Sequence, residues 1–348
     1  MFQAHLQHAM QIQENIALKP FNTFGITATA RYFSTFTAVD ELQSIIDAKQ
    51  VQHTQRMVLG GGSNVLFTKD FDGLILKNEL KGIELVHEDN DWYYVKAQAG
   101  ENWHSFVLHC IAHNYAGVEN LSLIPGNVGA SPMQNIGAYG VEIKDVFHEL
   151  EAYNLHDREV VHFSPGDCAF GYRESVFKRK YKDQFVILNV TFRLRKKPVF
   201  NTSYGAIEQE LEKMHVQSLS IQAISSAVIN IRSSKLPDPK EIGNAGSFFK
   251  NPTVPNEQFT ALQQAFPAIV GYAFGAHDTK LAAGWLIEQC GWKGYREGDA
   301  GCHAKQALVL VNYGNATGGE IYDLSSKIVA SVKERFGVGL EREVNIIA

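Results

Sequence analysis

The chain has 348 residues, of which 45% are hydrophobic and 20% charged, and this composition is that of a globular protein and not of a disordered one. A formal net charge of −5 argues against a general nucleic-acid binder, and no stretch approaches the 18 apolar residues of a membrane span. Because the first 20 residues lack the basic and apolar regions of a signal peptide, we expect a cytoplasmic protein. The four cysteines lack paired spacing, which favours reduced thiols and no metal site.

The first 200 residues are predicted to be rich in strands. We expect a helix near 38–49 and strands at 56–59, 73–78, 148–155 and 185–194, with another strand in YYVKAQAG. A helix is predicted at 101–116, because its apolar residues follow the i, i+3, i+4, i+7, i+8 spacing of one buried face. The polar, basic and turn-rich segment 195–205 then predicts a boundary.

Helices and strands alternate in the last part of the chain. Ile221, Ile224, Val228 and Ile231 form a helical stripe, and further helices are expected at 256–265, 279–290 and 318–336. The segment ALVLVN (307–312) is predicted to be a buried strand. The pattern therefore predicts an α+β protein whose second part is α/β.

A glycine-rich loop, LGGGSNVLF (59–67), follows an apolar strand. Backbone N–H groups approach an anion closely only where Cβ atoms are absent, so the loop suits a phosphate. It matches neither the P-loop nor the dinucleotide fingerprint. A tight turn remains an equal alternative.

A second loop, LIPGNVGASPMQNIGAYGVEI (123–143), holds four glycines and two prolines but few charges. Small uncharged residues suit a backbone that lies against a flat or apolar ligand. The alternative is an irregular packed turn between strands.

The stretch GNAGSFFKNP (243–252) places one hydroxyl, Ser247, among small residues and two phenylalanines. From its neighbours alone, Ser247 is typical of a turn. In the same way, Arg173 is typical of a solvated surface residue, and Glu343 of the solvent-facing side of an alternating strand.

Together these motifs resemble the UDP-N-acetylenolpyruvoylglucosamine reductase family, also called the UDP-N-acetylmuramate dehydrogenases. The resemblance runs from NTFGITATA (22–30) to EREVNII (341–347), nearly the whole chain. The segments that carry it, in family order, are GGGSN, IPGNVGASPMQNIGAYG, FGYRESVFK, KLPDP, GNAGSFFKNP and KQALVLVN. Several long motifs in the right order are far more specific than one glycine pattern.

The resemblance implies a fold and a reaction. Residues 15–200 would form a two-lobed FAD-binding unit of the vanillyl-alcohol-oxidase (PCMH) type, with lobes of about 15–78 and 79–200. Residues 215–348 would form an α/β substrate-binding domain. The implied activity is NADPH-dependent reduction of the enolpyruvyl group of UDP-N-acetylglucosamine-enolpyruvate to UDP-N-acetylmuramate, through enzyme-bound FAD, in peptidoglycan precursor synthesis. We expect a monomer whose only partners are small molecules.

The resemblance also assigns roles to residues. Ser247 matches the proton donor, Arg173 the arginine that faces the substrate carboxylate, and Glu343 an acidic partner near the developing enolate. The positions that match substrate contacts are Tyr172, Tyr204, Lys235, Asn251 and Gln306. Tyr204 matches a tyrosine on a mobile loop, which indicates the loop-bearing type I branch; a linker aromatic is the alternative.

Both glycine loops are expected to hold FAD. The assigned residues are Gly60, Gly61, Gly62, Ser63, Asn64, Pro125, Gly126, Gly129, Ala130, Ser131, Gln134, Asn135, Gly137, Ala138, Tyr139 and Gly140. Some members of the wider flavoprotein superfamily tether the flavin through His or Cys in these loops. Neither loop offers one here, so we expect non-covalent FAD.

Two other functions remain open from the sequence. A flavin oxidase that passes electrons from an alcohol to oxygen is disfavoured by the missing tether and by KLPDP and SFFKNP. A flavin-binding protein without turnover would require a broken catalytic set, whereas Ser247, Arg173 and Glu343 are all present.

Overall fold

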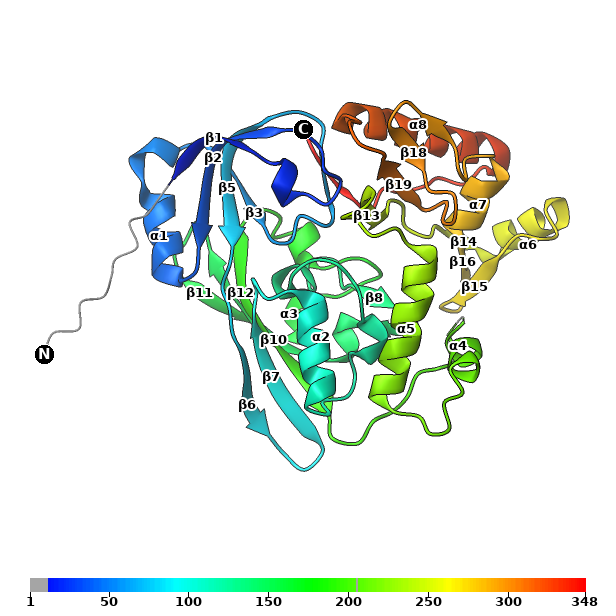
Figure 1. Ribbon diagram of the computed structural model, residues 1–348, viewed down its shortest axis with the longest axis horizontal. Helices are drawn as coiled ribbons and strands as arrows, with labels where there is room; N and C mark the ends of the chain where they lie inside the picture. The colour runs from blue at the N-terminus through cyan, green and yellow to red at the C-terminus, as the bar shows by residue number, and fades with distance from the viewer. Residues whose placement is uncertain (1–11, 205) are drawn as a thin grey trace, which may run out of the picture.

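The structure is a computed structural model that describes residues 12–204 and 206–348 (Figure 1). Residues 1–11 lie outside this range. The prediction that the first 20 residues are not a signal peptide therefore falls largely on residues that are not described. Within the described ranges, no helix is both long and apolar enough to cross a membrane.

The first lobe is a four-stranded sheet covered by one helix. Its strands, in spatial order, are β1 (Gln13–Ala17), β2 (Thr29–Phe36), β5 (Phe71–Asn78) and β3 (Gln55–Leu59). The last three are parallel and β1 is antiparallel. Helix α1 (Val39–Asp47) packs Leu42, Ile45 and Ile46 against this sheet, as the predicted helix at 38–49 requires.

The second lobe is a five-stranded antiparallel sheet. Its strands, in spatial order, are β11 (Val160–Phe163), β10 (Phe147–Asn154), β12 (Phe185–Arg195), β7 (Trp92–Gln98) and β6 (Ile83–Glu88). Helix α2 (Trp103–Ala112) buries the five apolar residues of its predicted stripe against one face. Part of the opposite face packs against the first lobe, where Tyr153, Val186 and Leu188 join the buried cluster beneath α1.

Two helices lie beside the second lobe. In α5 (Ile221–Lys235), Ile221 packs into the core of the five-stranded sheet, whereas Ile224, Val228 and Ile231 pack against α4 (Ile207–Lys213). The predicted helical stripe is therefore confirmed. Figure 1 shows α5 running alongside α2.

The C-terminal part contains two antiparallel sheets and three helices. The larger sheet is β13 (Gly243–Ser247), β19 (Val309–Asn312), β18 (Ala300–Cys302) and β17 (Arg296–Glu297). The smaller is β14 (Thr253–Pro255), β16 (Asp278–Leu281) and β15 (Gly271–Phe274). The helices are α6 (Asn256–Ala265), α7 (Ala283–Gln289) and α8 (Gly318–Phe336), and the predicted bounds of α6 and α8 are confirmed.

The helix predicted at 279–290 is wrong at its start. Residues 278–281 form β16, between β14 and β15, and only 283–289 are helical. Thr279 and Leu281 are buried and their neighbours are less so, which is the period of a strand. Hydrogen bonding to β14 on one side and β15 on the other stabilises a strand here instead of the predicted helix.

The end of the chain returns to its beginning. Strand β20 (Asn345–Ile347) pairs in parallel with β4 (Val65–Phe67), the strand that follows the first glycine loop. One hydrophobic cluster contains buried residues of both parts, such as Phe24, Phe248 and Ile328. The division at 15–200 and 215–348 stays a prediction, but this packing places the residues before β20 beside the first glycine loop.

The remaining elements are short. They are β8 (Gly137–Ala138), β9 (Val141–Glu142), α3 (Pro165–Cys168), and the 3-10 helices η1 (Lys19–Phe21), η2 (Lys49–Val51), η3 (Glu119–Leu121), η4 (Val128–Ala130), η5 (Ile143–Asp145) and η6 (Val176–Lys178).

Candidate active site

The two glycine loops face each other. A Cβ built on Gly61 would lie 2.9 Å from both Asn127 Oδ1 and Gly126 Cα, and one on Gly126 would lie 2.7 Å from Ser63 Oγ. Glycine is therefore required at both positions for the close approach. The N–H groups of residues 61–64 donate to no other described residue, so they are free to bind an anion.

The second loop is anchored on the junction between β7 and α2. Trp103 N–H donates to Gly126 O at 3.0 Å, and Val128 N–H donates to Glu101 O at 2.8 Å. The side chains of Ser131 and Asn135 are buried and hydrogen-bonded inside the protein. At these two predicted flavin positions, contact with a ligand is therefore left to backbone groups.

The second loop ends in a hairpin formed by β8 and β9. Its two turn residues, Tyr139 (φ +50°) and Gly140 (φ +81°), both have positive φ, as in a type I′ turn. Glycine accepts this conformation freely, whereas a tyrosine there is strained. Asn201 Nδ2 donates to Gly140 O at 3.0 Å, and the Tyr204 ring meets the Tyr139 ring edge-on at 6.2 Å. The hairpin therefore contacts the predicted lid.

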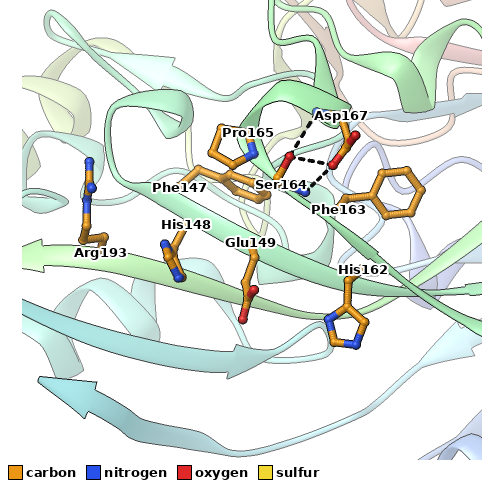
Figure 2. A pocket seen from close by; sticks show the side chains of 9 residues that line it. All are labelled: Phe147, His148, Glu149, His162, Phe163, Ser164, Pro165, Asp167 and Arg193. Atoms are coloured by element: carbon orange, nitrogen blue, oxygen red, sulfur yellow. Dashed lines mark hydrogen bonds between the residues drawn. The ribbon is translucent and has the colours of Figure 1, made fainter.

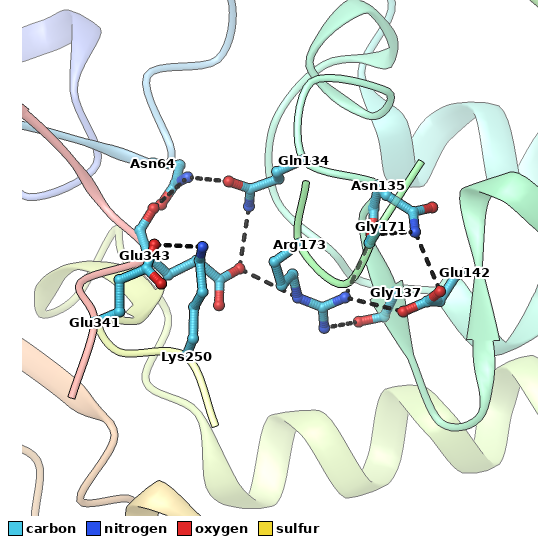
Figure 3. A network of polar contacts seen from close by, with 10 residues as sticks. All are labelled: Asn64, Gln134, Asn135, Gly137, Glu142, Gly171, Arg173, Lys250, Glu341 and Glu343. Carbon is cyan, nitrogen blue, oxygen red and sulfur yellow. Dashed lines mark hydrogen bonds and ion pairs between the residues drawn. The ribbon is translucent and has the colours of Figure 1, made fainter. Parts of the chain in front are cut away.

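A polar network joins predicted residues from four distant segments (Figure 3). Asn64 Nδ2 donates to Gln134 Oε1 at 2.8 Å, and Gln134 Nε2 donates to Glu343 Oε1 at 3.2 Å. Arg173 Nε lies 3.3 Å from the same Glu343 oxygen. The structure thus brings together one residue of the first loop, one of the second, and two of the three predicted catalytic residues.

Arg173 is held in place by backbone carbonyls. Its Nη2 donates to Gly137 O at 2.5 Å and its Nη1 to Asn135 O at 3.4 Å, while Glu142 lies 3.9 Å away. Arg173 has φ +54°, a strained conformation for a non-glycine residue that is often found at functional sites. A guanidinium fixed in this way keeps N–H groups available for a bound carboxylate.

The C-terminal segment pairs with the stretch that contains Ser247. Glu343 N–H donates to Phe248 O at 2.8 Å, and Lys250 N–H donates to Glu341 O at 2.9 Å. Ser247 itself ends β13 after a bulge, next to Gly246 with φ +69°. Its side chain is exposed and makes no hydrogen bond to another described residue. The third predicted catalytic residue is therefore adjacent to Glu343 through the backbone, with a free hydroxyl.

Glu343 is a buried carboxyl group among positive charges. Only 13% of its side chain is exposed, and burial raises its pKa, while Arg173, Lys178 and Lys250 act in the opposite direction. Burial disfavours the charged form more than these cations favour it. The result is a carboxyl group that holds its proton at a higher pH than an ordinary glutamate does.

Sequence reasoning missed several charged residues here. Lys178 and Lys250 face Glu343, and burial lowers the pKa of Lys178. Lys280 Nζ lies 3.5 Å from the centre of the Tyr172 ring and 4.1 Å from that of Phe274. Lys178 and Lys250 lie within the motifs GYRESVFK and GSFFKNP, so they could have been selected as site residues from the sequence. Lys280 lies in none of the motifs and could not.

The predicted substrate contacts divide into two groups. Tyr172 stacks with Arg173 at 5.3 Å and meets the backbone of Asn251, so it belongs to the network region. Asn251 Oδ1 accepts from Ala283 N–H at 3.0 Å, at the start of α7, and Gln306 Oε1 lies beside Gly284 of the same turn. Tyr204 and Lys235 are exposed, at the hairpin and at the end of α5.

The chain matches two family models and several curated proteins. A family model described as "FAD binding domain" matches residues 30–164, and one described as "UDP-N-acetylenolpyruvoylglucosamine reductase, C-terminal domain" matches residues 238–347. Curated UDP-N-acetylenolpyruvoylglucosamine reductases from Flavobacterium johnsoniae and Amoebophilus asiaticus are 51% and 52% identical to this chain, over 97% of it and 100% of their own lengths. The chain belongs to the UDP-N-acetylenolpyruvoylglucosamine reductase family.

A solved structure supports the fold of this reductase family member. The crystal structure of UDP-N-acetylenolpyruvylglucosamine reductase from Thermus caldophilus superposes with a TM-score of 0.68 at 22% identity, covering 97% of this chain and 99% of that one. The predicted fold class, with its FAD-binding unit, is confirmed.

The residues present fit an FAD. The matched FAD binding domain contains both glycine loops, and the unpaired N–H groups of residues 61–64 suit a diphosphate. The network residues Asn64, Gln134 and Glu343 bring the predicted catalytic side chains to the same loops. We therefore expect this reductase family member to hold the cofactor between the loops and the Ser247 segment.

A separate hollow of about 420 Å³ lies on the outer face of the second-lobe sheet (Figure 2). Its lining includes His148, Glu149, His162 and Arg193, from β10, β11 and β12. None of its lining residues belongs to the network of Figure 3. This hollow is therefore separate from the predicted active site.

Proposed function

We propose that the protein is an FAD-containing oxidoreductase that uses NADPH to reduce the enolpyruvyl group of UDP-N-acetylglucosamine-enolpyruvate to UDP-N-acetylmuramate, a step of peptidoglycan precursor synthesis. The observation that carries this proposal is the Arg173–Glu343–Gln134–Asn64 network, which ties a buried acid and a fixed guanidinium to both FAD loops. Family membership at about 50% identity over nearly the whole chain supports the substrate.

When bound, FAD takes a hydride from NADPH and supplies a hydride to the enolpyruvyl double bond. Hydride addition at one alkene carbon leaves negative charge that spreads into the neighbouring carboxylate of the substrate. Two tasks then fall to the protein: to stabilise this charge and to deliver a proton to the other carbon.

Arg173 is suited to the first task. Carbonyl groups of Asn135 and Gly137 fix its guanidinium before any ligand arrives, so little reorganisation is needed as charge develops. A planar guanidinium holds a carboxylate through two hydrogen bonds and remains charged at all relevant pH values.

Ser247 is suited to the second task, because its hydroxyl is free and stands one residue from the partner of Glu343. Glu343 supports it electrostatically or as an acid. Burial already raises the pKa of Glu343, and a substrate carboxylate near Arg173 adds negative charge that raises this pKa further. Substrate binding thus promotes the protonated form that the reaction consumes.

The decisive experiment follows the flavin colour without oxygen. NADPH should bleach the yellow protein, and UDP-N-acetylglucosamine-enolpyruvate should restore the colour with formation of UDP-N-acetylmuramate. A flavin oxidase would not bleach with NADPH. A flavin-binding protein without turnover would not recover its colour with the substrate.

We expect the FAD to be bound without a covalent link, because residues 59–67 and 123–143 contain neither His nor Cys. Acid denaturation followed by filtration should release all of the yellow colour. Flavin that stays with the precipitated chain would contradict this expectation.

A further inference from the structure

The first turn of α2 holds the entry of the second flavin loop. Trp103 Nε1 donates to Leu121 O at 2.9 Å, and the backbone N–H of Trp103 donates to Gly126 O at 3.0 Å. Between these two contacts, Leu123 N–H donates to His104 Nδ1 at 3.0 Å. Together these three hydrogen bonds fix the chain that leads into the glycines of the loop.

The bond between Leu123 and His104 differs from the other two because its acceptor can titrate. A backbone N–H supplies the hydrogen, so Nδ1 must be unprotonated and the neutral ring carries its proton on Nε2. The two Trp103 bonds use an indole N–H, a backbone N–H and two carbonyl groups, none of which titrates near neutral pH. Leu123 N–H therefore has an acceptor only while His104 is neutral, since it donates to no other described residue.

Leu123 stands at a point of the chain that needs such a bond. It has φ +59°, which is a strained conformation for a non-glycine residue. The preceding Ser122 is buried, and its Oγ donates to Glu119 O at 2.7 Å, so the backbone before Leu123 is already fixed. The hydrogen bond to His104 thus holds the residue at which the chain turns into the loop.

The surroundings of His104 favour its neutral form. Burial lowers the pKa of His104, and the charge of Arg232 on the neighbouring α5 lowers it further (Figure 1). The buried carboxyl group of Glu119, in η3, accepts a backbone N–H, and burial raises its pKa. Glu101, just before α2, accepts from Gly82 N–H at 2.7 Å. The core face of the second-lobe sheet beneath α2 is apolar, and the loop itself has no charged side chain over 123–138.

We propose that His104 is a positioning residue of the flavin site, whose neutral ring holds the entry of the second loop and whose protonation releases this entry and weakens FAD binding. This inference rests on the proposed function, in which residues 123–143 hold FAD. When Nδ1 gains a proton, two N–H groups face each other and the hydrogen bond is lost. FAD held against the loop keeps Leu123 in place, so FAD binding and protonation of His104 oppose each other.

The test measures the Kd of the full-length apoprotein for FAD between about pH 5 and pH 8, which brackets the ordinary histidine pKa of about 6.5. Because the pKa of His104 is lowered in the folded protein, affinity is complete above the ordinary value and is lost as pH falls below it. The wild-type Kd should rise by about 10- to 100-fold over this range, the loss expected when a hydrogen-bonding group is left without its partner.

Two variants separate the acceptor from its titration. His104→Asn places an amide oxygen near the position of Nδ1 and does not titrate, so its Kd should stay near the wild-type value at high pH and remain there as pH falls. His104→Phe keeps a ring without an acceptor, so FAD should bind about 10- to 100-fold more weakly at every pH.

His109→Asn is the matched control. His109 lies on the same helix and burial lowers its pKa too, but its ring stacks on His113 and makes no hydrogen bond to a described residue of the loop. This variant should keep the pH dependence of wild type.

Three results would overturn the inference. They are a wild-type Kd that does not change with pH, a His104→Asn variant with the full wild-type pH dependence, and a His104→Phe variant that loses thermal stability but binds FAD normally. Failure of the proposed function has a different signature. A protein that shows the predicted FAD binding in all variants, yet does not reduce the enolpyruvyl sugar nucleotide, would support this inference and contradict the proposed reaction.

Discussion

Two groups of titratable side chains among the described residues differ in burial and in origin. The network of Figure 3 draws on residues near 64, 134, 173 and 343, and the exposure of Glu343 is only 13%. The hollow of Figure 2 draws on adjacent strands of one sheet, and 65% of the His162 side chain is exposed. In the first place, burial raises the pKa of Glu343 and backbone carbonyls hold Arg173 in a fixed position. The comparison indicates that the reactive site lies where buried side chains from distant segments come together, and that a surface hollow is a weaker guide to it.

The largest expected effect is that of Ser247→Ala, which removes the hydroxyl beside the network. General-acid groups contribute about 10²- to 10⁴-fold, so kcat should fall by about that factor. FAD content and thermal midpoint should stay near wild type, because the side chain is exposed and makes no hydrogen bond to another described residue. Ser247→Cys should retain part of the rate, and Ser226→Ala on α5 is the matched control. A normal kcat for Ser247→Ala would show that Ser247 is only a turn residue and does not donate the proton.

Glu343→Gln should change the pH dependence of the substrate half-reaction. Burial raises the pKa of Glu343, so its protonated form, which we expect the reaction to need, is lost only as pH rises through this raised value. The wild-type rate should fall by about tenfold per pH unit above it, and the glutamine variant should lack this decline while turning over about 10²-fold more slowly.

The same substitution carries a stability signature. Because the pKa is higher in the folded than in the unfolded state, the folded protein binds more protons between the two values. The unfolding free energy of wild type, relative to Glu343→Gln, should therefore fall as pH rises through this window. Glu341→Gln is the control, since its exposed carboxylate lies two residues before Glu343 and pairs with Lys250. An identical decline in rate for wild type and Glu343→Gln would exclude Glu343 as the acid.

A smaller effect is expected for Tyr204→Phe at the lid. The phenyl ring can keep its contact with Tyr139, and only a hydroxyl on a half-exposed side chain is lost. One hydrogen bond corresponds to a rise of about 2- to 10-fold in KM for the sugar nucleotide, with NADPH oxidation nearly unchanged. Tyr322→Phe on α8 is the control. An unaltered KM would make Tyr204 a linker aromatic.

The smallest effect should come from the hollow of Figure 2. Replacing His148 and His162 by alanine together leaves the network untouched, so kcat/KM should stay within about twofold of wild type. A fall of tenfold or more, with FAD content intact, would show that the outer face of the sheet takes part in the reaction.

Much of the fold could be predicted because periodicity and turn residues act locally. The stripe of α2 and the bounds of α6 and α8 follow from apolar spacing alone. Strand β16 did not, because its conformation depends on pairing with β14 and β15 on both sides. Local propensity yields to such tertiary contacts.

The residues of the proposed site could be selected from the family motifs, whereas the chemistry of each position taken alone did not identify them. Glu343 has the pattern of a solvent-facing strand residue, yet pairing with the 248–250 stretch buries it beside Arg173. Lys280 could not be found, because it contacts the Tyr172 ring, which lies more than 100 residues away in the sequence. Contacts of this kind arise only from the folded arrangement.

The central claim is that the Figure 3 network and Ser247 serve the substrate half-reaction. Stopped-flow absorbance of the flavin, recorded separately for each half-reaction of Ser247→Ala, tests it most directly. We predict that NADPH bleaches the variant at nearly the wild-type rate, and that recolouring by the enolpyruvyl substrate slows by about 10²- to 10⁴-fold. Equal slowing of both half-reactions would contradict the account, because Ser247 would then position the flavin and not donate the proton.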